Sequence, residues 1–203
     1  DIHRKDVRIG DWVIIERAGD VIPHVVGPVL DRRTGKETEF EMPKFCPVCD
    51  TGVVKPEDEA MHRCPNTSCP AQFFELLKHF VSKGAMDIDG LGEQWCRILI
   101  DQKLVSDLSD LYKLKKEELL ELDRMGEKLA DKIIGNIEAS KKRPLPRLLF
   151  ALGILHVGSE VAELLAQRYG NMAELAAASE EQLTEISGIG PKIAESIVAY
   201  FAV

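Results

Sequence analysis

The chain has 203 residues, of which 45% are hydrophobic and 30% are charged, as is ordinary for a globular protein. Its formal net charge of −8 counts against a generic nucleic-acid-binding protein, which would carry a basic surface. The sequence contains no apolar run long enough to cross a membrane, and it begins without a signal peptide. Because the first residues do not look like a natural start, we expect a fragment of a longer protein.

Residues 1–42 are expected to form β structure. Runs of β-branched or aromatic residues alternate with glycine-containing turns. The runs are Val7 and Ile9, Trp12 to Ile15, Val21-Ile22 and Val25-Val26. Short strands at this spacing are typical of a small barrel, but about 40 residues are too few for a complete barrel core. The sequence therefore predicts part of a barrel.

Residues 43–72 contain two close pairs of cysteines, Cys46 with Cys49 and Cys64 with Cys69. Two such pairs have the spacing of a tetrahedral zinc site, and four thiolate ligands leave no open position for water or substrate. The segment has few large apolar residues, so it needs a metal to hold it together. We therefore expect a structural zinc site.

Three alternatives for these thiols remain open. Two disulfides would require an oxidising compartment, and redox chemistry would require a thioredoxin-like fold around Cys46 and Cys49. His62 offers a further ligand in place of one cysteine. The fifth cysteine, Cys96, is expected to be a small buried residue without a role in metal binding.

The remaining residues, 73–203, are predicted to be helical. Phe73 to Val81 forms an amphipathic helix that should end near Gly84 and dock on the first of several repeats. Further helices are expected from Leu108 to Leu122, from Leu145 to Leu152 and from Leu175 to Ile186.

One pattern occurs four times in this helical part, centred on Gly92, Gly126, Gly158 and Gly190. Apolar residues recur one and four positions before each glycine and three and seven positions after it, and a small residue recurs four positions after it. The offsets of +3, +4 and +7 mark the buried face of a helix that begins at the glycine. Each unit is therefore a turn that leads into a helix, and the four units form an internal repeat.

The first and fourth units carry a second glycine, Gly90 or Gly188, which can adopt φ > 0 and close a tight turn. The glycine that follows leaves the amide end of the next helix open to an anion such as phosphate. This pattern resembles the helix-hairpin-helix motif, which grips the nucleic-acid backbone. The competing interpretation is an ordinary glycine turn, but four aligned copies favour the hairpin motif.

Candidate DNA-contacting residues in these units are Gly90, Gly92, Gly126, Lys128, Gly158, Gly188, Gly190 and Lys192. Units two and three carry Arg124 and His156 in place of the first glycine. Their turns either pack against protein or contact phosphate through side chains, and we expect stronger phosphate binding from the outer units. The negative net charge does not exclude such contacts, because they act over a Debye length of about 8–10 Å.

The order of these segments is similar to the C-terminal part of the bacterial NAD-dependent DNA ligases. The resemblance is carried by Asp6 to Asp11 and Arg17 to Pro23, which look like that family's OB-fold segment, and by Cys64-Pro65-Asn66 with Cys69 to Gln72. It implies an α+β, mainly α, fold with part of an OB-fold in 1–42, a zinc module in 43–72 and four tandem helix-hairpin-helix units in 73–203. It also implies that Arg17 contacts DNA and that the hairpins clasp nicked duplex DNA.

Family members become adenylated at a Lys-x-Asp-Gly motif, which does not occur in these 203 residues. By this resemblance, the intact enzyme would seal 5′-phosphate/3′-hydroxyl nicks with NAD and Mg²⁺, while this part positions DNA and holds no catalytic residue. We expect a monomer that works in the bacterial cytoplasm with the adenylation domain of the same parent chain. Acidic residues near the turns, Asp87, Asp89 and Asp123, are interpreted as helix caps and not as a nuclease site.

Two other functions remain open at this point. The chain could be a stand-alone DNA-binding repair accessory protein, which would not need a much longer parent. It could instead be an acidic scaffold that binds proteins and no DNA.

Overall fold

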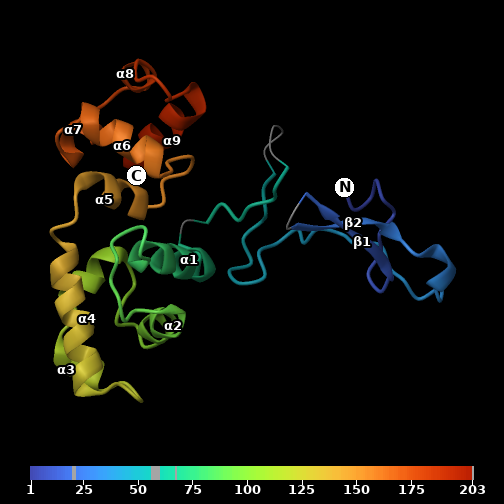
Figure 1. Cartoon of the computed structure of the whole chain (residues 1–203), viewed down its shortest axis with the longest axis horizontal. Helices are drawn as coiled ribbons and strands as arrows, with labels where there is room; N and C mark the ends of the chain where they lie inside the picture. Colours follow the sequence, from blue (N-terminus) through green and yellow to red (C-terminus); the bar gives the residue numbers. More distant parts are fainter. Residues whose placement is uncertain (20–21, 56–59, 67, 203) are drawn as a thin grey trace. The chain divides into compact units, whose positions relative to one another are not determined.

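The computed structural model describes residues 1–19, 22–55, 60–66 and 68–202 of the chain. It contains two compact units, Asp1–Asn66 and Thr67–Val203, which are coloured blue to cyan and green to red in Figure 1. Each unit is described by itself below. In the described ranges, no helix has both the length and the apolar character that a membrane crossing requires.

The first unit contains one antiparallel hairpin, β1 (Val13–Ala18) and β2 (Ile22–Pro28), followed by a short 3-10 helix, η1 (Leu30–Arg32). The register shifts between Ile14 and Ile15, so the strands carry a bulge. The expected run from Trp12 to Ile15 is confirmed as the beginning of β1, which starts at Val13. The strand expected near Val7 and Ile9 is wrong, because only an isolated bridge from Ile9 to Thr38 forms there. The expected strand residue Val21 lies outside the described residues.

This hairpin does not bury its own apolar side chains. Trp12, Ile14 and Ile22 are 62%, 53% and 71% exposed, and Cys46 is the only buried hydrophobic residue among the described residues of the unit. A two-stranded sheet without a packed face is marginally stable in water. The unit therefore depends on polar contacts and on the cysteine cluster.

The strongest of these polar contacts joins Arg33 to two carboxylates. Arg33 donates from Nε to Asp11 Oδ1 over 2.8 Å and from Nη2 to Asp11 Oδ2 over 2.7 Å, and its Nη1 lies 2.8 Å from Asp6 Oδ2. The Asp11 carboxylate is 1% exposed, and it also accepts from the backbone N–H of Arg8 at 2.7 Å. The Arg33 guanidinium lowers the pKa of Asp11 to about 2.

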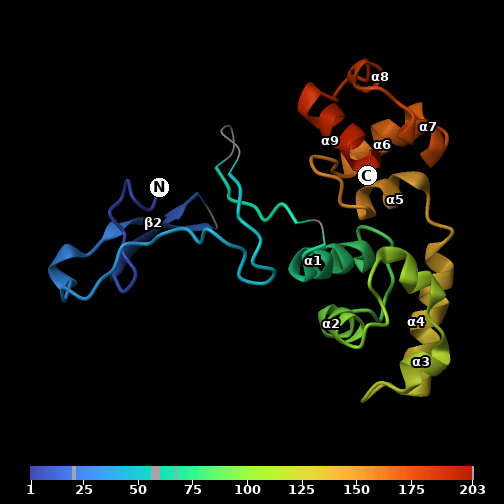
Figure 2. The same ribbon diagram turned by 180° about the vertical axis from the view of Figure 1, so that it is seen from behind.

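The second unit begins with a helical half that contains the first two repeats. Its elements are α1 (Pro70–Val81), α2 (Glu93–Asp101), η2 (Leu108–Lys113), α3 (Lys116–Leu120) and α4 (Glu127–Ser140). They enclose one core that includes Leu77, Phe80 and Leu99. Figures 1 and 2 show these green and yellow helices gathered together from both sides.

The other half contains the last two repeats. Its elements are α5 (Leu145–Ala151), α6 (Ser159–Arg168), α7 (Met172–Ala176), α8 (Glu180–Thr184) and α9 (Pro191–Phe201). They enclose a separate core with Leu149, Leu165 and Ile197. The expected mainly helical α+β fold is therefore confirmed.

Two of the expected helices are wrong as continuous elements. The stretch from Leu175 to Ile186 is interrupted because the Ser179 side chain accepts from the Gln182 N–H and starts α8 as a new helix. The stretch from Leu108 to Leu122 divides into η2 and α3. The helix expected from Phe73 begins earlier, at Pro70, and ends at Val81 before Gly84.

The two halves are joined by α1 and α5. His79 Nε2 lies 2.7 Å from the carbonyl oxygen of Phe150, so this ring nitrogen must donate, and the His79 and Phe150 rings meet edge to face with centroids 4.6 Å apart. Gly153, two residues after the end of α5, has φ +64, and a β-carbon at this position would lie 2.8 Å from Leu76 Cδ1. A glycine is therefore favoured where the halves meet, because any other residue would have to adopt a left-handed backbone and displace the Leu76 side chain.

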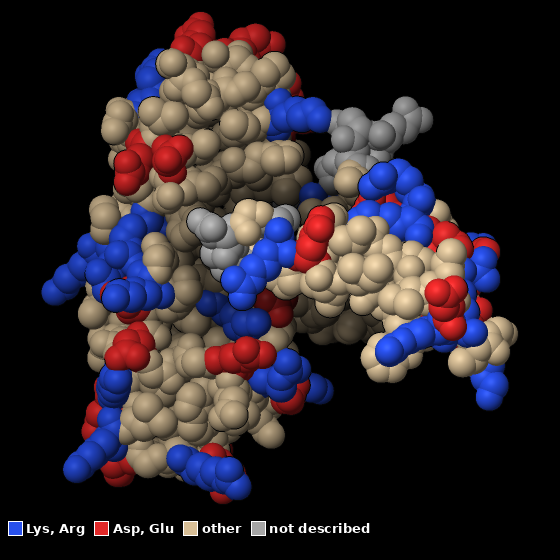
Figure 3. Space-filling view, turned by 45° about the vertical axis from the view of Figure 1, so that its right-hand side comes forward, with Lys and Arg blue, Asp and Glu red and all other residues tan. Residues whose placement is uncertain are grey.

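Charged side chains do not form a continuous basic surface on the face seen in Figure 3. Lys and Arg gather there in separate clusters, with Asp and Glu between them. Several basic groups are engaged within the protein, such as Arg143, whose Nη2 lies 2.6 Å from Asp87 Oδ2. Figure 3 therefore gives no support for a broad basic binding surface on this face.

Candidate metal centre and nucleic-acid interface

Short backbone turns position the cysteines. Cys46 donates its N–H to Thr51 O at 2.8 Å, and the Asp50 N–H returns to Cys46 O at 2.9 Å, with Asp50 at φ 56. This closed turn places Cys46 and Cys49 side by side. Cys69 is the N-cap residue of α1 and precedes Pro70, which is suited to the first helical position.

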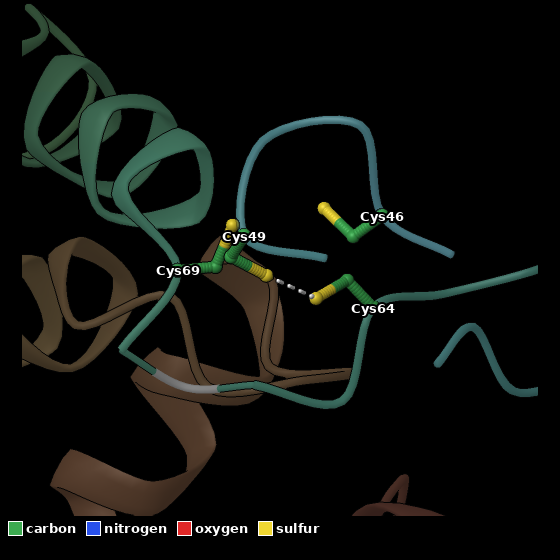
Figure 4. Close-up of side chains that lie close together, drawn as sticks. All are labelled: Cys46, Cys49, Cys64 and Cys69. Carbon is green, nitrogen blue, oxygen red and sulfur yellow. Dashed lines mark hydrogen bonds between the residues drawn. The ribbon is translucent and has the colours of Figure 1, made fainter. Parts of the chain in front are cut away.

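The four thiols converge. Their sulfur atoms all lie within 4.8 Å of one another, and the Sγ atoms of Cys49 and Cys64 are 3.5 Å apart. Figure 4 shows the four side chains close together. Four sulfurs at the usual Zn–S bond length would be about 3.8 Å apart in a tetrahedron, so this cluster fits a zinc ion. All five cysteines lie in the described residues, and no disulfide joins any of them.

The two facing thiols differ in acidity. The hydrogen bond with the Thr51 side chain, whose Oγ1 lies 3.3 Å from Cys49 Sγ, lowers the pKa of Cys49 to about 6. The backbone of Asn66 lowers the pKa of Cys64, but burial and the neighbouring thiols outweigh it and raise that pKa to about 11. Cys96 is fully buried in the helical core, as expected, and burial raises its pKa to about 11.

The helical repeat is confirmed in detail. Each repeat glycine is the N-cap of a helix, Gly92 of α2, Gly126 of α4, Gly158 of α6 and Gly190 of α9. The alanines and the cysteine four positions later are fully buried, as are the aliphatic residues seven positions later. The residue before each glycine donates its N–H to the carbonyl four positions before the glycine, for example Ile189 to Ile186 at 2.9 Å. One hydrogen bond therefore closes every turn.

The turns with and without the second glycine share a positive φ at this position. Gly90 and Gly188 have φ +103 and +96, and the residues that replace them, Arg124 and His156, have φ 64 and 66. All four positions are therefore left-handed, although this conformation costs a non-glycine residue about 1–2 kcal/mol. Backbone shape alone gives no reason for the outer turns to bind phosphate more strongly, and that expectation remains a prediction.

The second glycine also has a packing role that sequence reasoning missed. A β-carbon on Gly90 would lie 3.0 Å from Ile133 Cγ1 of α4, and one on Gly188 would lie 3.1 Å from Leu164 Cδ1 of α6. The first hairpin therefore packs on the second, and the fourth packs on the third. In the sequence, only the arrangement of the four repeats in two pairs could have indicated these contacts between hairpins.

The N-cap glycines, in contrast, face open space. No atom lies within 4 Å of a β-carbon built on Gly92, Gly126, Gly158 or Gly190. The first N–H groups of each following helix have no acceptor within the helix. Each turn is therefore accessible to an anion, which the positive end of the helix dipole would favour.

Side chains near these amide ends distinguish the units. Glu93, Glu127 and Glu160 stand in the first turns of α2, α4 and α6, while the first turn of α9 contains Lys192 and no acidic residue. A carboxylate there competes with an incoming phosphate. The fourth unit therefore has the most favourable charge.

The remaining candidate residues are dispersed. Lys128 is exposed in the first turn of α4, and Arg17 is exposed on β1 of the other unit. Lys132, which follows the second hairpin glycine, lies 2.6 Å from Asp89 and holds the first hairpin to α4. The structure therefore assigns Lys132 and Asp89 a contact between hairpins, and Lys132 is less available for phosphate than Lys128.

Paired helical hairpins and a four-thiol metal centre in one chain define a zinc-containing helix-hairpin-helix protein. Comparison with known families agrees segment by segment. The NAD-dependent DNA ligase OB-fold domain matches residues 1–37, and the NAD-dependent DNA ligase C4 zinc finger domain matches residues 45–71. The SAM-like helix-hairpin-helix tandem matches residues 83–138, and the helix-hairpin-helix motif matches residues 147–203.

Curated relatives named DNA ligase match almost the whole chain. The chain is 52% identical to the protein of Bacillus cytotoxicus over 98% of its length, 51% identical to that of Rubrobacter xylanophilus over 99%, and 53% identical to that of Dehalococcoides mccartyi over 100%. It spans 30%, 29% and 31% of the lengths of these relatives. The chain belongs to the NAD-dependent DNA ligase family and carries its OB-fold, zinc-finger and helix-hairpin-helix parts.

The metal of the cysteine cluster is zinc, because the segment is a C4 zinc finger and its four thiols converge. Thr51 and Asn66, which form hydrogen bonds with the thiols, were not predicted as part of this site. Polar residues next to a cysteine are too common to be identified from one sequence.

Proposed function

We propose that this chain is the DNA-holding portion of an NAD-dependent DNA ligase, and that it positions nicked duplex DNA for an adenylation domain of the same parent chain. The observation that supports this most directly is the set of four N-cap glycines with open space at the β-carbon position. Bare amide groups recognise a sugar-phosphate backbone without reading bases. Such contacts suit an enzyme that must act at a nick in any sequence.

The chemistry belongs to the parent protein in this proposal. The parent seals a 5′-phosphate/3′-hydroxyl nick with NAD and Mg²⁺, while residues 1–203 bind and orient the duplex. The parent acts as a monomer in the bacterial cytoplasm, where thiols remain reduced and available to zinc. The domain boundaries proposed for this part are residues 1–42, 43–72 and 73–203.

Within this part, we assign the zinc ligands to Cys46, Cys49, Cys64 and Cys69. Zinc supplies a structural link and no catalysis, because four thiolates complete its coordination. The ligand set leaves His62 as a surface residue.

DNA binding is tested with the zinc-loaded chain and a fluorescent duplex, nicked or intact, at two salt concentrations. We expect salt-sensitive binding with a preference for the nicked duplex. Gly190→Val should weaken binding by about tenfold, since a branched side chain would cover the amide end of α9. Gly135→Ala is a control, because Gly135 lies in the middle of helix α4, has open space at its β-carbon position and does not belong to a hairpin turn.

Binding that is absent at low salt would contradict the proposal and favour a protein scaffold. Binding that survives Gly190→Val unchanged would contradict the assignment of the fourth hairpin. The length of the natural protein separates the ligase from a stand-alone accessory protein.

A further inference from the structure

The second hairpin contributes a feature that the bare turns do not have. Arg124 occupies the left-handed position of that turn and is 90% exposed. It lines an open pocket of about 800 Å³ together with Gly92, Trp95, Arg97 and neighbouring residues of α2. Arg124 of the second hairpin therefore lines the same pocket as the first residues of α2, the helix of the first hairpin.

The second arginine of this pocket is held in place from behind. The Arg97 guanidinium lies over the Phe74 ring at 4.2 Å from its centroid. Stacking restricts a guanidinium while leaving the N–H groups at its edge available, and those groups match the oxygens of a phosphate. Arg97 is therefore ordered before any ligand arrives.

The acidic groups nearby weaken this positive charge without cancelling it. Glu93 lines the pocket, but its carboxylate is 63% exposed and lies 3.9 Å from Lys78 Nζ. Asp123 lies 3.7 Å from Arg124 Nε, and both side chains are almost fully exposed. Such an exposed pair contributes little and can be exchanged for a phosphate.

We propose that Arg124 and Arg97 bind one backbone phosphate of the DNA in this pocket, so that hairpins one and two hold the strand jointly through side chains. The inference rests on the proposed DNA-binding function and adds to it a specific pair of residues. This phosphate contact explains why an arginine occupies a left-handed position in which a glycine would have a lower conformational free energy.

The test uses this backbone conformation. Arg124→Gly removes the guanidinium and relieves the left-handed strain, so the variant should be at least as stable as the natural chain. Arg124→Asn provides a second neutral variant, since asparagine also tolerates this conformation. Thermal unfolding of the zinc-loaded proteins verifies that both remain folded.

Lys103 offers a closely matched control. It is an exposed cation with φ 58, it follows the far end of α2, and it lies outside the pocket. Lys103→Gly therefore makes the same change in net charge and relieves the same kind of backbone strain. Any difference between the two variants reports position and not total charge.

The measurement is duplex binding by fluorescence anisotropy over a series of salt concentrations. Losing one phosphate contact should reduce the slope of log K against log salt by about 0.9. The loss of affinity between about 50 and 200 mM salt should then be roughly 3.5-fold smaller for Arg124→Gly and Arg124→Asn. Lys103→Gly should keep the natural slope, and Arg97→Met should behave as the Arg124 variants do.

Equal slopes for Arg124→Gly and the natural chain would overturn the inference while leaving the proposed function intact. Equal reductions for Arg124→Gly and Lys103→Gly would also overturn it, because total charge would then explain the effect. A natural chain that binds no duplex at low salt would instead contradict the proposed function itself.

Discussion

Leu164 of the third hairpin covers Gly188 of the fourth, so that a β-carbon on Gly188 would lie 3.1 Å from Leu164 Cδ1. This contact separates two roles within one motif. Gly188 serves the fold through its φ of +96 and its packing, whereas Gly190, two residues later, faces open space. The two glycines should therefore respond differently to the same substitution.

We predict that Gly188→Ala destabilises the chain by about 1–3 kcal/mol, because the left-handed backbone and the Leu164 contact both oppose a methyl group. Gly190→Ala should cost less than about 1 kcal/mol, since φ −86 suits any residue and only the cap preference is lost. Urea denaturation followed by circular dichroism measures both. Equal losses at the two positions would contradict the division of roles.

Zinc removal should loosen one segment and spare the helices. We expect one zinc per chain by metal analysis, and chelation should increase hydrogen exchange in residues 43–72 first. The helices of the second unit should stay protected because they have their own cores. Zinc affinity should fall as the pH is lowered, since only deprotonated thiolates bind zinc and protons compete with the metal for them. A metal-free chain with reduced thiols and unchanged exchange would refute this prediction.

The first unit should lose structure in acid through Asp11. Its pKa in the folded chain is about 2, below the ordinary value of about 3.9, so ionised Asp11 stabilises the fold above about pH 4. That stabilisation is lost as the pH falls from about 4 to 2. Trp12, whose ring lies 4.9 Å from the Arg32 guanidinium, reports the change by fluorescence when Trp95→Phe removes the other tryptophan.

Asp11→Asn provides the comparison for that experiment. It removes the ion pair with Arg33 at every pH, so the variant should be less stable at neutral pH and should lack the acid transition. An identical acid transition in Asp11→Asn would assign the effect to another carboxylate.

Two tyrosines, the buried Tyr169 and the partly buried Tyr112, should respond differently to the loss of the hydroxyl group. Tyr169 OH is buried without a hydrogen-bond partner among the described residues, so Tyr169→Phe should be neutral or stabilising by up to about 1 kcal/mol. Tyr112 OH lies 3.2 Å from Ser140 Oγ, and Tyr112→Phe should cost about 0.5–1.5 kcal/mol. Thermal unfolding measures the stability of both variants. A large loss of stability in Tyr169→Phe would contradict the prediction, because it would mean that the Tyr169 hydroxyl group has a hydrogen-bond partner.

Much of the helical part could be read from residue spacing. The repeat of glycine with buried residues at +4 and +7 identified the starts of α2, α4, α6 and α9, because a helix buries residues at that period whatever its surroundings. The spacing of Cys46 and Cys49 indicated a metal site for a similar reason, since a short turn brings such thiols together. Helix ends were less predictable, and local caps such as Ser179 divided one expected helix into two.

Local sequence thus determined the four turns, the helices that follow them and the identity of the thiols that gather. Only the tertiary structure showed that Gly90 and Gly188 lie in close contact with side chains of the neighbouring hairpin, and that Arg124 shares a pocket with Arg97. These features depend on residues 24 to 43 positions apart in the chain, and the chain path, not the local pattern, sets the distance between them. Periodicity reports which face of a helix is buried, but it contains no information on which partner covers that face.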